Sequence, residues 1–126
     1  MSVPQNLHYA TSHEWCILNQ DGSYSVGITH HAQEALGDIV FIELPKVGQI
    51  VHAKLNCAVV ESVKAASDIH APISGEIIAI NDSLIKAPEI INTDPYGSWF
   101  FKIQPTNSNE LNDLLDSSAY AASVGE

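Results

Sequence analysis

Short apolar segments, each closed by a turn signal, follow one another through most of this chain. The segments read SYSVGI, DIVFIEL, NCAVVESV, SDIHAPI, EIIAI and SWFFKI, and the stretches DG, LPKVG, PISG and NDS punctuate them. Their period-two or continuous β-branched character is typical of strands, so we predict a mainly β barrel or sandwich. With 126 residues the chain can bury a core unaided, and we expect residues 1–126 to form a single domain.

Two segments break the β pattern. Thr29 is a suitable N-cap for a short helix over 30–36, which the following glycine ends. Near the end of the chain, Asn107 and Glu110 have the spacing of a capping box. An apolar stripe at helical spacing comes next: Leu111, Leu114, Leu115, Ala119 and Ala122. We therefore predict a C-terminal helix near 108–122 that packs on the sheet.

The hexamer at 37–42, GDIVFI, recurs at 75–80 as GEIIAI, which gives the pattern G-[DE]-I-[VI]-x-I. Two copies are too few for a solenoid and favour a barrel of two related halves, although a chance match of β-rich hexamers stays an alternative. If the halves are related, a hairpin between the copies has the residues VKAA at its tip. This tip holds no Gly, Pro, Asn or Asp, so we expect a turn without positive φ, of type I, from which Lys64 projects.

The charge balance excludes one large class of partners. The net charge is -10 and all five cationic residues are lysines. Because nucleic acids are bound by clustered Lys and Arg, we expect no nucleic-acid partner. The acidic surface can steer basic protein partners or serve solubility, and composition leaves both interpretations open.

No apolar run approaches the roughly 20 residues of a membrane-spanning helix. The first residues, MSVPQNLHYATSHEW, have neither the basic start nor the apolar stretch of a signal peptide. We therefore expect no membrane association and a cytoplasmic location, or the mitochondrial matrix if a transit segment has been removed from a eukaryotic precursor.

The usual enzymatic and metal-binding patterns are missing. Cys16 and Cys57 lie in apolar β-like segments without CxxC spacing, so we expect buried free thiols. The adjacent pair His30 and His31 lacks the spacing of a metal site, and we predict no metal. No nucleotide-binding motif is present, and no nucleophile, base and orienting group converge by spacing. An enzyme in its own right is therefore disfavoured.

The stretch ESVKAASD places Lys64 between small residues at the predicted hairpin tip. An ordinary surface lysine is the simplest interpretation. A Schiff-base lysine would need burial to lower the pKa of its amine, which an exposed tip cannot provide. A lysine that carries a covalently attached group needs reach and access, and the flexible stem and unhindered amine suit that role.

Five separated stretches resemble the glycine cleavage system H protein family. They are TSHEW (11–15), VGIT with AQEALGDIVFIELP (26–45), VVESVKAASD (59–68), APISGEI (71–77) and NTDPYG (92–97). Biotin carriers usually have Met on both sides of the lysine, whereas Val63 and Ala65 flank it here. Lipoyl domains of 2-oxoacid dehydrogenases typically have Asp before the lysine and lack the TSHEW and DPYG segments.

The resemblance implies a lipoyl/biotinyl-type barrel-sandwich hybrid of two pseudo-symmetric halves. It would form one lipoyl-carrier domain, 1–126, with N-terminal and C-terminal extensions packed on it. Lipoic acid would be joined to Lys64 as an amide. The arm would serve a pyridoxal-phosphate glycine decarboxylase, a folate-dependent aminomethyltransferase and a dihydrolipoamide dehydrogenase. By the same resemblance Ser12, Glu14 and Asp68 line a cleft for the loaded arm, and we assign Glu61 to recognition by the lipoate-attaching enzyme.

Two other functions stay open: a relay that passes lipoate to other enzymes, and an unmodified β-sandwich interaction module with a free Lys64. Three departures from the family concern loop geometry. Lys54 stands where a turn glycine is usual, His30 replaces a common acidic residue, and PYGSWFF is about one residue shorter than usual.

Overall fold

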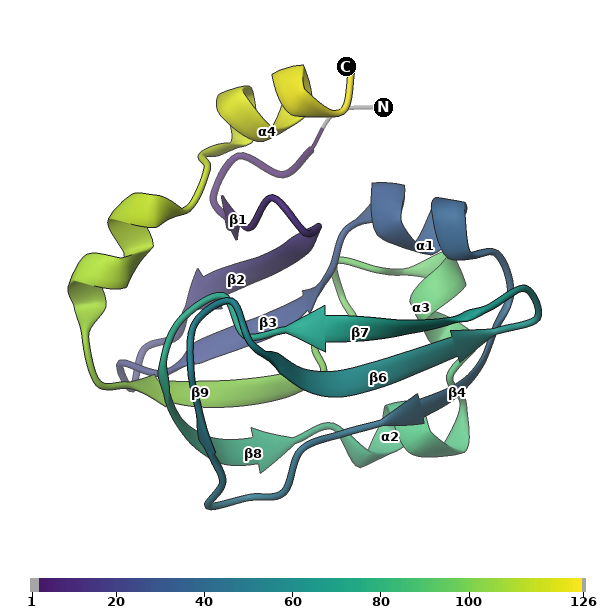
Figure 1. Ribbon diagram of the computed structural model, residues 1–126, viewed down its shortest axis with the longest axis horizontal. Coiled ribbons are helices and arrows are strands. Elements are labelled where there is room, and N and C mark those ends of the chain that lie inside the picture. The colour runs from purple at the N-terminus through teal and green to yellow at the C-terminus, as the bar shows by residue number, and fades with distance from the viewer. Residues whose placement is uncertain (1–2, 126) are drawn as a thin grey trace.

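The computed structural model describes residues 3–125, which form two antiparallel sheets (Figure 1). The larger sheet has the order β1 (His8–Tyr9), β2 (Glu14–Leu18), β3 (Tyr24–Ile28), β9 (Phe101–Pro105), β8 (Gly75–Ile80) and β5 (Ile50–Val51). The smaller sheet has the order β4 (Ile39–Glu43), β6 (Asn56–Ser62) and β7 (Ala66–His70). The prediction of a mainly β fold is confirmed.

Short helices complete the fold: α1 (His30–Leu36), α2 (Asp82–Lys86), α3 (Ile90–Thr93), the 3-10 helix η1 (Ser108–Asp113) and α4 (Ser117–Ser123). The predicted helix over 30–36 is confirmed. Its N-cap Thr29 accepts a hydrogen bond from the Ala32 backbone N–H at 3.2 Å, and Gly37 ends it with φ 81°. Within residues 3–125, no helix is long and apolar enough to cross a membrane.

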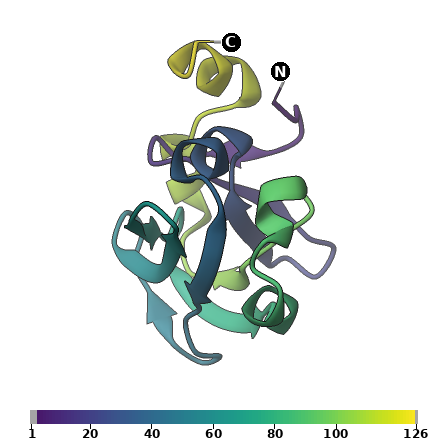
Figure 2. The same ribbon diagram turned by 90° about the vertical axis from the view of Figure 1, so that its right-hand side faces the viewer.

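The main core lies between the two sheets. Aliphatic side chains from five strands meet there and are 0–2% exposed: Val26, Ile28, Ile42, Val60, Ile77 and Ile103. Full burial of each such side chain contributes about 1.5–3 kcal/mol. A smaller cluster of Leu7, Tyr9, Trp15 and Tyr120 lies where α4 covers β1 (Figures 1 and 2).

The internal repeat is a repeat of structure as well as of sequence. In β4 the pairing with β6 skips one residue, Val40, between Ile39 and Phe41. In β8 the pairing with β9 skips Ile78, which is the fourth residue of its hexamer just as Val40 is of its own. Each copy therefore forms a strand with a β-bulge at the same position, and this agreement supports two related halves over a chance match.

The C-terminal helix is shorter than predicted. The single helix over 108–122 was wrong in its first half, because the chain is extended after η1 and Leu115 forms a β-bridge with Tyr9. The two backbone hydrogen bonds of this bridge are 2.7 and 2.8 Å. Asp116 then caps α4 by accepting from the Ala119 N–H at 2.8 Å. A tertiary pairing with β1 thus overrides the local helical stripe.

The predicted capping box was also wrong. Asn107 accepts from the Asn109 N–H at 3.1 Å, so its side chain does cap η1. The Glu110 carboxylate instead accepts from the Ser74 backbone N–H at 2.7 Å and the Ser74 hydroxyl at 2.8 Å. Glu110 therefore fastens the C-terminal segment to the loop before β8.

Candidate functional site

Lys64 lies at the tip of the hairpin formed by β6 and β7. The Ser62 N–H donates to the Ala65 carbonyl at 2.8 Å, and the Ser62 hydroxyl accepts from the backbone N–H groups of Lys64 and Ala65 at 3.2 Å each. No residue of the tip has positive φ, as its composition predicts; His13 and Lys54 are the non-glycine residues of the described chain that do. The backbone of the tip is therefore fixed while the Lys64 side chain is exposed.

The stem of Lys64 leans over Gly37 at the end of α1. A Cβ built on Gly37 would lie 3.3 Å from Lys64 Cε and 3.6 Å from Nζ. Gly37 also has φ 81°, which disfavours any side chain. Glycine at this position leaves the space in which the lysine stem lies.

A hollow of about 160 Å³, which we call the β7 cleft, runs between β7, α1 and the β1–β2 turn. Its lining is Ser12, His13, Ile28, Ala32, Ala35, Leu36, Ser67, Asp68 and Ile69. Of the residues predicted for an arm cleft, Ser12 and Asp68 line it. Glu14 lies behind Ser12, whose hydroxyl donates a hydrogen bond to Glu14 Oε1. Glu61 is not in the cleft; it pairs with Phe41 on the exposed face of the smaller sheet.

Glu14 is a buried carboxylate, 1% exposed, with partners on both oxygens. Besides the Ser12 contact, its Oε2 accepts from the His70 backbone N–H at 2.8 Å and lies 3.3 Å from His70 Nδ1. Burial raises the pKa of Glu14, and the hydrogen bonds from Ser12 and His70 oppose that rise. A cation placed in the cleft would also oppose this rise in the pKa of Glu14, because an opposite charge favours the ionised form.

His70 is a residue of the site that the sequence did not reveal. It lies on β7, an edge strand, and Glu14 occupies the free N–H of that edge. The sequence signal was weak, because His70 and Glu14 are far apart in the chain and only the fold brings them together. Its half-buried imidazole places a titratable group against the buried carboxylate.

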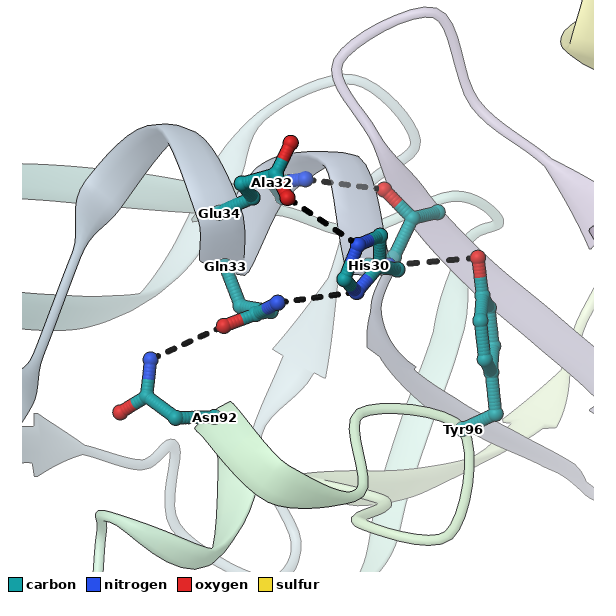
Figure 3. A network of polar contacts seen from close by, with 7 residues as sticks. His30, Ala32, Gln33, Glu34, Asn92 and Tyr96 are labelled. Carbon is teal, nitrogen blue, oxygen red and sulfur yellow. Dashed lines mark hydrogen bonds and ion pairs between the residues drawn. The ribbon is translucent and has the colours of Figure 1, made fainter. Parts of the chain in front are cut away.

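A network of amide contacts holds α1 in place as the wall of the cleft (Figure 3). Asn92 of α3 donates to Gln33 Oε1 at 3.0 Å and to the Gly37 carbonyl at 2.9 Å. Its Oδ1 accepts from the Ile39 N–H at 2.9 Å. One side chain thus joins α3 to both the end of α1 and the start of β4.

His30, which departs from the common acidic residue, takes part in the same network (Figure 3). Its backbone N–H donates to the Tyr96 hydroxyl at 3.2 Å, and its ring contacts Gln33 at 2.9 Å and Glu34 at 3.3 Å. The first turn of α1 contains no acidic side chain. The helix start is therefore stabilised by Thr29 and Tyr96 in place of a carboxylate at the helix dipole.

The C-terminal helix α4 also supports the cleft. The Tyr120 hydroxyl lies 2.7 Å from Thr29 Oγ1 and 2.9 Å from His13 Nδ1. Thr29 caps α1 and His13 belongs to the β1–β2 turn, so this hydroxyl joins two walls of the cleft. The ring of Tyr120 stacks on Tyr9 with centroids 4.5 Å apart.

Sequence stretches that are far apart converge beside this site. The Trp15 indole N–H, from TSHEW, donates to the Ile28 carbonyl at 2.9 Å and the Pro95 carbonyl at 3.2 Å. Gly27 lies under the Trp15 ring, where a Cβ would come within 2.8 Å of the indole nitrogen. The TSHEW, VGIT and NTDPYG segments therefore form one packed unit behind the cleft.

A second hollow, of about 280 Å³, has Ser12 and His70 in its lining. Lys54 contributes to its wall and has φ 73°, so a side chain occupies a turn position that favours glycine. The departure at Lys54 is thus accommodated by strained backbone and not by a different turn type.

The comparisons with known proteins agree with one another. Residues 7–126 match the family described as glycine cleavage H-protein. The chain is 56% identical over 126 residues to a glycine cleavage system H protein of Shewanella sp. (strain MR-7), covering 99% of this chain and 98% of that one. It is 58% identical over 123 residues to glycine cleavage system H protein 2 of Pseudomonas aeruginosa, covering 98% and 95%.

A solved structure, the crystal structure of a glycine cleavage system H protein from Mycobacterium marinum, superimposes with a TM-score of 0.91. It is 42% identical in sequence, and the match covers 98% of this chain and 100% of that one. The chain therefore belongs to the glycine cleavage H-protein family.

Proposed function

We propose that this protein is the lipoyl carrier of a glycine cleavage system, with lipoic acid joined as an amide to Nζ of Lys64. The observation that carries the proposal is the position of Lys64: exposed, on a fixed hairpin tip, and next to a cleft with a buried carboxylate behind it. A carrier needs an accessible amine on a rigid support, because tethering then keeps the attached group close to each partner's active site.

The residues present fit such a group. The β7 cleft lies along β7, the strand that follows Lys64. Its apolar walls, which suit an aliphatic arm, include Ile28, Ala32 and Leu36. Its polar part holds Ser12 and Asp68, with Glu14 behind them. The lipoyl dithiolane supplies the sulfur chemistry, and the protein supplies attachment, orientation and shelter from water.

The proposed partners are those that the family resemblance implies. A pyridoxal-phosphate glycine decarboxylase loads an aminomethyl group with release of CO2. A folate-dependent aminomethyltransferase removes it as ammonia and methylene-tetrahydrofolate, and a flavin-containing dihydrolipoamide dehydrogenase reoxidises the dithiol. The chain itself has no turnover in this scheme.

Glu14, Asp68 and Ser12 are proposed to hold the ammonium of the loaded arm. An aminomethyl thioether breaks down when the nitrogen lone pair expels the thiolate, and a protonated nitrogen has no free lone pair. The buried Glu14 carboxylate stabilises a cation strongly because little water screens it. Glu14 and Asp68 therefore protect the cargo by keeping its nitrogen charged.

The test of this role is the rate at which the loaded carrier releases ammonia. We expect Glu14→Ala to release ammonia faster than the unchanged protein. Glu89→Ala removes an exposed carboxylate at the N-cap of α3, outside the lining of the cleft, and should leave the rate unchanged. A Glu14→Ala rate no higher than that of the unchanged protein contradicts the role. The same assay on Asp68→Asn tests the second carboxylate.

Glu61 is proposed to be read by the lipoate-attaching enzyme, since it is exposed on β6 three residues before Lys64. Glu61→Gln is expected to slow lipoylation, measured as the lipoylated fraction against time. Unchanged lipoylation removes Glu61 from this role.

The first experiment for the function as a whole is an intact mass after expression with lipoate, with peptide mapping of residues 61–68. A lipoyl adduct on Lys64, together with glycine decarboxylation that depends on this chain, supports the carrier. A lipoylated chain that does not support decarboxylation favours the relay of lipoate. A free Lys64, in a host that lipoylates its own carriers, favours the interaction module.

A further inference from the structure

A histidine lines the β7 cleft together with the polar residues already described. His13 is part of the lining, next to Ser12 and with Asp68 in the same hollow. Its Nδ1 lies 2.9 Å from the Tyr120 hydroxyl of α4, and its ring centroid lies 4.6 Å from that of His31 on α1. The cleft therefore contains, besides its carboxylate, a side chain that can itself become a cation.

The backbone and the neighbouring ring hold His13 in place. Its φ is 75°, and its N–H donates to the Ala10 carbonyl at 3.0 Å while its carbonyl accepts from the Thr29 N–H at 3.0 Å. The Tyr120 ring meets the imidazole edge-on, with centroids 5.7 Å apart. A charge on this imidazole would therefore stay beside the cleft.

The surroundings of His13 favour its neutral form. Burial, together with the adjacent His31, lowers the pKa of His13. The Tyr120 hydroxyl can donate to Nδ1 of a neutral ring, whereas both nitrogens of an imidazolium carry protons and accept nothing. The remaining ionisable groups near it are Asp68, which lines the same cleft, and Glu14, which follows it at the start of β2. At neutral pH the ring is uncharged.

A protonated His13 would oppose a second cation in the same hollow. Groups on the walls of a hollow of about 160 Å³ lie within about 10 Å of a cation inside it. At that distance and an effective dielectric constant of about 20, like charges weaken each other's binding about ten-fold. The effect is reciprocal, so a cation in the cleft weakens proton binding by His13 by the same factor.

We infer that His13 is the charge gate of the β7 cleft: a neutral imidazole lets the cleft hold the ammonium of the loaded arm, and an imidazolium expels it. This inference rests on the proposed function and adds regulation of the same site. Glu14 and Asp68 attract the ammonium, whereas His13 decides whether that attraction meets an opposing charge. The carrier would thus keep its cargo at neutral pH and lose it as the pH falls through the folded pKa of His13.

The first test reads His13 itself, by NMR titration of the imidazole in the full lipoylated chain. One thiol of the reduced arm is alkylated with 2-bromoethylamine, which leaves a stable ammonium, or with 2-bromoethanol, which leaves a neutral group of similar size. Burial raises the pKa of Cys16 and of Cys57 to about 12, so both are spared, and intact mass verifies a single adduct. The two arms then differ in charge alone.

The aminoethyl arm is expected to weaken proton binding by His13 about ten-fold relative to the hydroxyethyl arm. The shifts of His52, an exposed residue outside the cleft lining, should be the same for both arms at a fixed pH. Equal titration of His13 with the two arms overturns the gate and leaves the proposed function intact. A chain that takes up no lipoyl group, in a host that lipoylates its own carriers, refutes the proposed function and the gate with it.

The second test measures ammonia release from the loaded carrier between pH 7.5 and pH 5.5. The rate of the unchanged protein is divided by that of His13→Asn, which cancels the titration of the cargo amine and leaves the effect of His13. We expect this ratio to rise up to about ten-fold as the pH falls, because only the unchanged protein acquires an imidazolium in the cleft. His52→Asn in place of His13→Asn should give a ratio that does not change with pH. A flat ratio for His13→Asn, or an equal rise for His52→Asn, overturns the gate.

Discussion

The Tyr120 hydroxyl joins α4 to two walls of the cleft, so we expect Tyr120→Phe to lower the stability of the protein measurably. The substitution removes one hydroxyl from a fully buried ring and keeps the stacking on Tyr9. That hydroxyl has contacts to Thr29 at 2.7 Å and to His13 at 2.9 Å. Each buried hydrogen bond contributes about 1 kcal/mol, so the free energy of unfolding should fall by about 2 kcal/mol.

Thermal unfolding followed by circular dichroism at pH 7.5 measures this loss. At about 2.1 cal/mol/K of unfolding entropy per residue, a loss of 2 kcal/mol lowers the Tm of a chain of 126 residues by about 8 °C. Tyr9→Phe provides a graded control, because its hydroxyl donates a single hydrogen bond, to the Pro4 carbonyl, and should cost about half as much.

A double-mutant cycle assigns the effect to the contact with Thr29. Tyr120→Phe and Thr29→Val should show a coupling of about 1 kcal/mol, although Thr29→Val alone also loses the N-cap of α1. Additive effects, or a Tm for Tyr120→Phe within about 1 °C of the unchanged protein, would refute the view that α4 braces the cleft.

Two further predictions concern titration and backbone strain. Burial, together with the nearby His31, lowers the pKa of His13 below the usual 6.5. The unfolded state then binds more protons than the folded state, so the stabilisation is complete above about pH 6.5 and is lost as the pH falls through the folded pKa. Between pH 7.5 and pH 5, the Tm of His13→Asn should therefore fall less steeply than that of the unchanged protein. Asn is chosen because it tolerates the positive φ of this position, and equal slopes contradict a contribution of His13 to the pH dependence. Lys54→Gly should stabilise the protein by about 0.5–1 kcal/mol, because glycine adopts φ 73° without strain. The neighbouring Ala53→Gly should destabilise it by a similar amount. Urea unfolding measures both changes, and a loss of stability in both variants contradicts strain at Lys54.

Local chemistry carried enough information for several elements. Thr29 and Gly37 bound α1 where capping preferences place the ends of a helix, and the composition of the tip around Lys64 predicted a turn without positive φ. These features depend on residues adjacent in sequence. The single-domain organisation of residues 1–126 stays a prediction. So do the roles assigned to five residues: Lys64, Glu14, Asp68, Ser12 and Glu61.

Long-range contacts explain what the sequence could not supply. The stripe from Leu111 to Ala122 has helical spacing, but pairing of Leu115 with Tyr9 outweighs it and divides the segment. His70 reaches Glu14 only because β7 lies against the β1–β2 turn. The bulge at Val40 was likewise hidden, since strict alternation is the default expectation for a strand.

The hydrogen bonds of Ser62 at the hairpin tip have a consequence for the speed of the cycle. Since they fix the backbone N–H groups of Lys64 and Ala65, a group attached to the amine would reorient through the torsions of the lysine side chain and of the group itself, and not through the backbone. Rotamer changes of exposed side chains take picoseconds to nanoseconds, whereas enzymes typically turn over about 1–1000 times per second. If Lys64 carries the proposed arm, that arm would sample its whole range many thousands of times between chemical steps, so its delivery would be limited by binding and release and not by the rotation of the arm.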